Sequence, residues 1–229
     1  MAAEFIDAVK KGDREAVERM LSTDSALVGA KDENGTSAIL LAHYYGRKDV
    51  ARALLARMPS LDIFEASTAG DVERVRELLQ KDRSLVNAVA HDGFFPLGLA
   101  AFFKHPQLAR VLLEHDADPQ MASRPAGFTP LHSAVADDAG TETIETKELV
   151  RMLLDAGADP NARSATDGTP LHTAAFTGNM PVVQMLLAAG GDPHAPDKKG
   201  LTPLDLAREV GHSEAAALLH DAVLGKRPS

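Results

Sequence analysis

The chain contains no cysteine and no tryptophan. Without cysteine it can form no disulfide, no thiolate nucleophile and no cysteine-ligated zinc site. Aromatic residues make up only 4% of a sequence that is 45% hydrophobic, so the core must be built from Leu, Val, Ala and Met. Any place where aromatic side chains gather is therefore unusual for this chain.

Basic residues are also in deficit, with 24 Lys and Arg against 33 Asp and Glu, a formal charge of −9. No stripe of basic residues offsets this charge, so we expect no nucleic-acid partner. Long apolar runs are missing as well. The first residues, MAAEFIDAVKKGD, lack the apolar segment of a signal peptide, and no run approaches the roughly 18 residues that span a bilayer. We expect no membrane partner and a cytoplasmic location.

One unit recurs along the chain. The stretch GTPLHTAAFTGNMPVVQMLLAAGGDP from Gly168 is followed 33 residues later by LTPLDLAREVGHSEAAALL, and FTPLHSAVADDAG from Phe128 precedes it. Each unit predicts a Thr helix cap, a Pro at the first helical position, an Ala-rich helix, a turn, a second helix rich in Val and Leu, and a Gly-Ala-Asp-Pro exit. Such helix pairs cannot bury their apolar faces alone, so we expect them to stack.

These motifs, T-P-L-H-x-A with a period of 33 and a G-A-D-P exit, resemble the ankyrin repeat family. The resemblance implies an all-α ankyrin-repeat solenoid of about seven helix-turn-helix repeats with short hairpin loops, which we call fingers. It also implies that first helices and fingers line a concave, partner-facing side. We expect one domain over 1–229, with repeats near 1–30, 31–58, 59–89, 90–122, 123–162, 163–195 and 196–225.

Two spacings depart from this period. The positions equivalent to the motif threonine are Ala3, Ser37, Leu61, Phe95, Thr129, Thr169 and Thr202. The 24-residue spacing after the second position leaves no room for a finger and predicts a notch near Pro59. The 40-residue spacing after the fifth adds seven residues within the acidic stretch 137–148, which forms either a longer turn with an early second helix or a dedicated acidic contact.

The front half also carries an internal duplication, because residues 4–55 align with 62–113 at a constant offset of 58. Glycine, aspartate and leucine positions coincide throughout this alignment. The front half therefore looks like a duplicated pair of repeats.

Motifs for catalysis are missing. We find no G-x-S-x-G elbow, no glycine-rich phosphate loop and no paired histidines at helical metal-binding spacing, so we expect no catalytic residue, no metal and no cofactor. His132 and His172 belong to the T-P-L-H motif and brace the helix start, with Asp205 in the same place in the last repeat. The EHDADP stretch is predicted to form the loop that follows a helix, with Asp116 in a left-handed backbone conformation.

The aromatic residues have a skewed distribution. Adjacent helical side chains point about 100° apart, so one apolar stripe cannot bury both rings of a neighbouring pair. At least one ring of each pair must stay accessible, while Phe5 and Phe64 are expected to be buried and Phe95 to fill the place of the missing Thr. We expect these side chains to form the partner-binding surface: Tyr44, Tyr45, Phe94, Phe102, Phe103, Phe128 and Phe176.

The sequence favours a non-catalytic module that binds a protein or peptide, or an inhibitor that blocks one enzyme. The alternative is a small-molecule-binding protein or enzyme with its site in the cleft between repeats 2 and 4. A deep pocket with convergent polar groups would favour that alternative, and a broad aromatic face would favour the first. Both terminal repeats carry polar residues, so we expect a monomer.

Stability should be uneven along the array. The first, third and fourth repeats lack the capping Thr, and losing such a cap typically costs about 1 kcal/mol. We therefore expect amide hydrogen exchange to be faster in the N-terminal half than in the C-terminal half. Uniform protection along the chain would contradict this prediction.

Overall fold

The computed structural model describes residues 1–58, 60–136 and 143–225. Within these ranges the chain forms seven consecutive pairs of α-helices and no β-strand. The first helices of the pairs are α1 (Ala2–Lys11), α3 (Ala38–Tyr44), α5 (Ile63–Ala69), α7 (Pro96–Phe102), α9 (Pro130–Val135), α11 (Pro170–Thr177) and α13 (Pro203–Glu209). The second helices are α2 (Arg14–Thr23), α4 (Lys48–Leu55), α6 (Val72–Lys81), α8 (Pro106–Glu114), α10 (Ile144–Asp155), α12 (Met180–Ala188) and α14 (Ser213–Val223).

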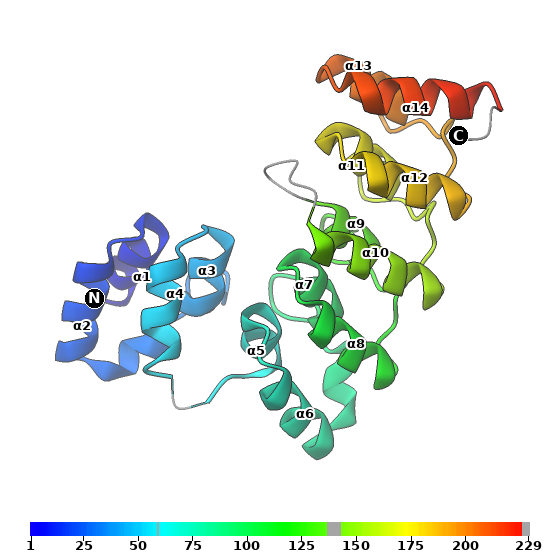
Figure 1. Cartoon of the computed structure of the whole chain (residues 1–229). Coiled ribbons are helices and arrows are strands. Elements are labelled where there is room, and N and C mark those ends of the chain that lie inside the picture. Colours follow the sequence, from blue (N-terminus) through cyan, green and yellow to red (C-terminus); the bar gives the residue numbers. More distant parts are fainter. Residues whose placement is uncertain (59, 137–142, 226–229) are drawn as a thin grey trace.

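The pairs follow one another in a curved row with the two termini at its opposite ends (Figure 1). Each first helix packs against the next first helix, and most second helices pack against the next second helix. One continuous apolar core runs between these two layers, built mainly from Leu, Val, Ala and Ile. None of the helices in the described ranges is long and apolar enough to cross a membrane.

The T-P-L-H histidines brace their helices as the motif predicts. In α9, His132 Nδ1 lies 2.9 Å from Thr129 Oγ1 and accepts from the Thr129 backbone N–H, so the ring proton lies on Nε2. His172 makes the same contact with Thr169 at 2.9 Å. Asp205 takes over this role in α13, where its carboxylate accepts from the Thr202 hydroxyl at 2.6 Å.

The same histidines also join neighbouring repeats, which the sequence pattern did not reveal. His132 Nε2 donates to the carbonyl of Gly168 at 3.1 Å, and His172 Nε2 lies 3.1 Å from the carbonyl of Leu201. Each ring therefore ties the start of one first helix to the finger of the next repeat. Burial lowers the pKa of His132 to about 4, which keeps the ring neutral and its Nδ1 free to accept.

The fingers are also joined to each other by backbone hydrogen bonds. They run from Arg124 N to Gly93 O at 3.1 Å, from Ala165 N to Ala126 O at 2.8 Å, and from Lys198 N to Thr166 O at 3.0 Å. These bonds link the fourth, fifth, sixth and seventh repeats. Between the second-repeat finger (30–37) and the fourth-repeat finger (88–95), no backbone hydrogen bond is present among the described residues.

The break in this series lies where the short spacing predicts a missing finger. Helix α4 ends at Leu55 and α5 begins at Ile63, and α4 and α6 do not pack closely together (Figure 1). Pro59, which we expected at the notch, lies outside the described residues. The fingers of repeats 2 and 4 meet instead, because the His91 ring lies directly on Gly35.

Helix capping differs from the sequence-based expectation in two repeats. The N-cap of α5 is Asp62, one residue after Leu61, the position equivalent to the motif threonine. The side chains of Asp62 and Glu65 form a complete capping box. The third repeat therefore has a cap after all, supplied by a carboxylate. Ser37 stands at the N-cap of α3 but makes no capping hydrogen bond, so the first helix of the second repeat lacks a side-chain cap, as those of the first and fourth repeats do. Phe64 is half-buried rather than buried, since no finger covers its outer side.

The duplication in the front half is confirmed. Helices α2 and α6, and α3 and α7, have bounds that differ by 58 residues at both ends. The short 3-10 helices Ser25–Gly29 and Arg83–Asn87 follow the same offset. The other two helix pairs differ at one end each, because α5 begins three residues later than the offset gives from α1 and α8 ends one residue later than it gives from α4.

Lys104 is an exception within this duplication. It stands where the earlier unit has Gly46, and it adopts the same left-handed backbone with φ 61°. Its ammonium donates to the carbonyls of Ala134 at 2.6 Å and Ala136 at 2.9 Å, at the end of α9. The extra residues of the fifth repeat follow α9 directly, so a side chain from the preceding repeat stabilises this helix end.

The contact between the fingers predicts a specific effect of Gly35→Ala. A Cβ atom there would lie 2.4 Å from His91 Cδ2, whereas Gly46 has a similar positive φ and no heavy atom within 4 Å of its Cβ position. We expect Gly46→Ala to lower the free energy of unfolding by about 1 kcal/mol and Gly35→Ala by roughly 1–3 kcal/mol more, measured by urea denaturation. Adding His91→Ala to Gly35→Ala should restore most of the difference. Equal costs for the two glycines would contradict the contact.

The neutral state of His132 predicts a pH dependence of stability. Its pKa is about 4 in the folded chain and near 6.5 when unfolded, so the unfolded chain binds more protons between these values. This contribution to the free energy of unfolding is complete above pH 6.5 and is lost as the pH falls toward 4. Urea denaturation at several pH values should show a weaker pH dependence for His132→Gln than for the exposed control His194→Gln. Parallel curves for the two variants would refute the assignment.

Candidate functional site

Aromatic rings gather where the fingers of repeats 2 and 4 meet. The Tyr44 ring, at the end of α3, stacks on Phe103 with centroids 5.9 Å apart and 14° between the planes. Phe94 from the fourth-repeat finger lies 5.9 Å from Tyr44, and Phe102 meets Phe103 edge-on at 5.0 Å. His43 adds an edge contact to Phe103 at 5.5 Å. We call these five side chains the ring cluster.

The ring cluster borders an open groove with a volume of about 750 Å³. The second-repeat and fourth-repeat fingers form its two walls, and Leu41, Tyr44 and Tyr45 of the α3 region form its floor. Phe94 also lines it. The groove therefore lies across the place where a third-repeat finger would separate these two fingers.

The groove has an acidic lining. Asp32, Glu33 and Asp92 are its acidic residues, and Arg124 of the fifth-repeat finger is also among its lining residues. Asp92 accepts a hydrogen bond from the Tyr44 hydroxyl at 2.8 Å, which fixes the ring to the finger. Burial, with Asp92 nearby, raises the pKa of Tyr44, so this hydroxyl remains a donor at physiological pH.

The predicted partner-binding residues fall into two groups. Tyr45 and Phe102 are 50% and 39% exposed, so one ring of each neighbouring pair is accessible, while Tyr44, Phe94 and Phe103 are half-buried. These five residues lie together at the groove and the ring cluster. Phe128 is exposed and stacks on His132, and Phe176 is 56% exposed with no ring contact among the described residues. Phe128 and Phe176 therefore do not join the groove.

A second, smaller hollow lies behind the meeting point of the fingers. It has a volume of about 110 Å³ and is lined by Leu40, Phe64, His91 and the start of α5. Sites for small molecules usually enclose about 300–1,000 Å³. The hollow is smaller than this range, and the groove, although its volume lies within the range, is open along the surface rather than enclosed, which weighs against the small-molecule alternative.

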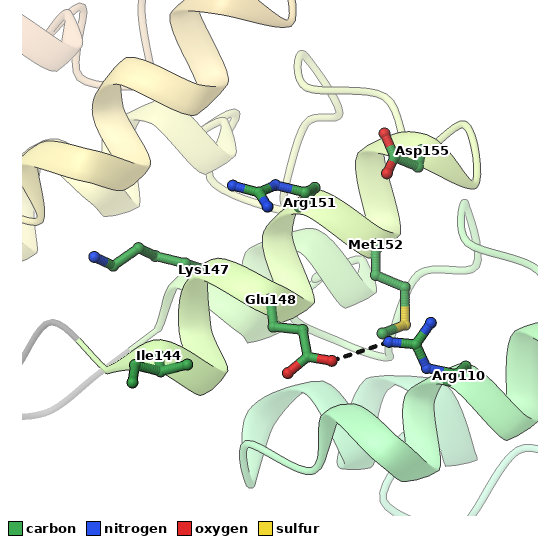
Figure 2. A pocket seen from close by; sticks show the side chains of 7 residues that line it. All are labelled: Arg110, Ile144, Lys147, Glu148, Arg151, Met152 and Asp155. Atoms are coloured by element: carbon green, nitrogen blue, oxygen red, sulfur yellow. Dashed lines mark hydrogen bonds and ion pairs between the residues drawn. The ribbon is translucent and has the colours of Figure 1, made fainter.

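A further hollow of about 640 Å³ lies on the second-helix side, between α8 and α10 (Figure 2). Arg110 of α8 and Glu148 of α10 face each other across it in an ion pair of 3.0 Å. Ile144 opens α10 with its side chain 81% exposed. The sequence reasoning missed this surface, although the long spacing of the fifth repeat was its signal.

The inserted stretch is described only in part. Residues 137–142 lie outside the described residues, so an acidic contact there stays a hypothesis. Helix α10 begins at Ile144, 15 residues before Asp159, whereas α12 begins at Met180, 12 residues before the equivalent Asp192. The second helix therefore starts about one turn early, as one of the two interpretations expected.

The EHDADP stretch forms a helix exit. Asp116 has φ 66°, in the left-handed region that the sequence predicts for it. His115 Nδ1 lies 2.8 Å from the carbonyl of Val111, and Asp118 Oδ1 accepts from the backbone N–H of Gln120. These side chains hold the local backbone of the exit loop.

Known protein families match most of this chain. A family model described as ankyrin repeats in three copies matches residues 63–164 and 142–227. These two ranges contain ten of the fourteen helices, from α5 to α14.

Several curated proteins are similar to it. Ankyrin repeat and SAM domain-containing protein 6 of Mus musculus is 36% identical over 103 residues, covering 45% of this chain and 11% of its own length. Ankyrin repeat and SOCS box protein 3 of Homo sapiens is 32% identical over 108 residues, covering 46% of this chain and 19% of its own length. E3 ubiquitin-protein ligase KEG of Arabidopsis thaliana is 28% identical, covering 77% of this chain and 14% of its own length. The chain thus spans less than a fifth of these relatives.

Proposed function

The chain belongs to the ankyrin repeat family, and from this membership we propose that it is a non-catalytic module that binds a protein or peptide at the groove and the ring cluster. Ankyrin repeats are general protein–protein interaction modules, so a protein partner follows from the family. The proposal adds where the partner binds and which side chains bind it.

The main support is the accessibility of Tyr45 and Phe102. Their neighbours Tyr44 and Phe103 are stacked on each other, so the exposed rings are held on a packed base rather than on mobile side chains. Rigid aromatic side chains lose little conformational entropy on binding and often supply most of the energy of an interface. An exposed cluster of this kind is rare in a chain with 4% aromatic residues.

The remaining expectations belong to the same proposal. We propose that the repeats act as one domain over 1–229, that the chain works as a monomer in the cytoplasm, and that it binds no nucleic acid. The net charge of −9 supports the last point, because it opposes approach to a phosphate backbone. An inhibitor of one enzyme is a special case of this module.

The proposal predicts that truncating the exposed rings weakens partner binding without unfolding the chain. We expect the variant Tyr45→Ala, Phe102→Ala to bind a captured partner at least tenfold more weakly than the parent chain. Phe103 is left intact because it packs on Tyr44 and His43. The measurement is affinity capture from the native host, followed by titration of the purified partner.

The matched control is Ile144→Ala, which removes an exposed apolar side chain from the second-helix side. It should leave binding within twofold of the parent chain, and thermal unfolding should show that both variants remain folded. Unchanged binding by the double-alanine variant would refute the proposed site.

A further inference from the structure

We propose that the groove recognises an extended protein segment through an arginine side chain of that segment, which lies between Glu33 and the Tyr45 ring. This inference rests on the proposed function and adds the chemistry of the partner. It is carried by the charge, the rings and the shape of the groove.

The carboxylates of the groove differ in what they already bind. Asp32 is only 8% exposed and has the Lys10 ammonium 3.5 Å away, while its other oxygen accepts from backbone N–H groups of its own finger. Asp92 is held by the Tyr44 hydroxyl. Glu33 is exposed and makes no ion pair among the described residues, so its charge is available to a ligand.

The balance of charge selects a cation. Asp32 is paired with Lys10, which leaves the carboxylates of Glu33 and Asp92 against one basic residue, Arg124, so an acidic side chain would be repelled and a basic one attracted. Arg124 is an exposed residue of the fifth-repeat finger, and its backbone is joined to Gly93 rather than to the second-repeat finger. The second-repeat wall, where Glu33 lies, is therefore the acidic side.

The rings select arginine among the cations. Tyr45 is half exposed and lines the same groove as Glu33. A guanidinium is planar, stacks on aromatic faces and can bind a carboxylate at the same time, whereas an ammonium is more strongly hydrated. A groove lined by both an available carboxylate and an exposed aromatic ring therefore fits arginine better than lysine.

The shape of the groove selects an extended segment. It is open along the surface between two narrow fingers, and its volume of about 750 Å³ accommodates a few side chains. Val89, 49% exposed, also lines it and offers an apolar contact to the residues that flank the arginine. A folded domain would contact the fingertips without filling this space.

The experiment is a selection of random twelve-residue peptides, displayed on phage, against the purified full chain. Selected peptides are then synthesised with the arginine or with citrulline, its neutral isostere, and titrated by fluorescence anisotropy. We expect arginine to be enriched, citrulline to weaken binding at least tenfold, and Glu33→Gln to weaken the arginine peptide five- to tenfold. Citrulline should cost much less in Glu33→Gln, since the two changes remove one interaction.

The matched control is Glu114→Gln, which makes the same change in net charge at an exposed residue that does not line the groove. It should leave affinity within twofold. Peptides without an excess of arginine, a library that yields no binder, or equal effects of Glu33→Gln and Glu114→Gln would each overturn the inference. If the selected peptides instead depend on Tyr45 and Phe102 but not on a cation, the proposed function stands and the inference of an arginine in the bound segment is wrong. If they are indifferent to Tyr45→Ala, both fail.

Discussion

No helix pair in this chain can bury its own apolar face, so every repeat depends on contact with its neighbours. The polar contacts follow the same constraint, because His132 and His172 each cap their own helix and bind the carbonyl of the next finger. Burial holds these rings neutral, which is the state in which one nitrogen accepts and the other donates. The strength of the array is thus located at the junctions between repeats rather than inside them.

The junction after the second repeat breaks this rule, and the candidate site lies there. No finger separates the fingers of repeats 2 and 4, so His91 rests on Gly35 and the two loops enclose a groove. All three buried side-chain polar atoms without a hydrogen-bond partner among the described residues, in Ser37, His43 and Thr68, belong to α3 and α5 or their caps at this junction. Unpaired buried polar groups among the described residues thus gather at the junction where the candidate site lies.

Much of this arrangement can be predicted from the sequence. The motif period gives the helix pairs, the 24-residue spacing gives the missing finger, and the 100° rotation between Phe102 and Phe103 gives the exposed ring. The Asp-x-x-Glu pattern that begins at Asp62 predicts the cap of α5, whereas the repeat period places the cap at Leu61. The contact of His91 with Gly35 and the reach of His132 to Gly168 could not be predicted, because they depend on how neighbouring repeats are placed.

Lys104 shows that the repeats of this chain are not interchangeable parts. Its ammonium donates hydrogen bonds to carbonyl groups at the end of α9. This helix belongs to the following repeat and precedes the inserted residues. The lysine thus belongs to one repeat, and the helix end that it stabilises, directly before the insertion in the sequence, belongs to the next. Exchanging the fourth repeat for a consensus unit, with glycine at this position, would remove these hydrogen bonds from the end of α9, even though every local motif was preserved.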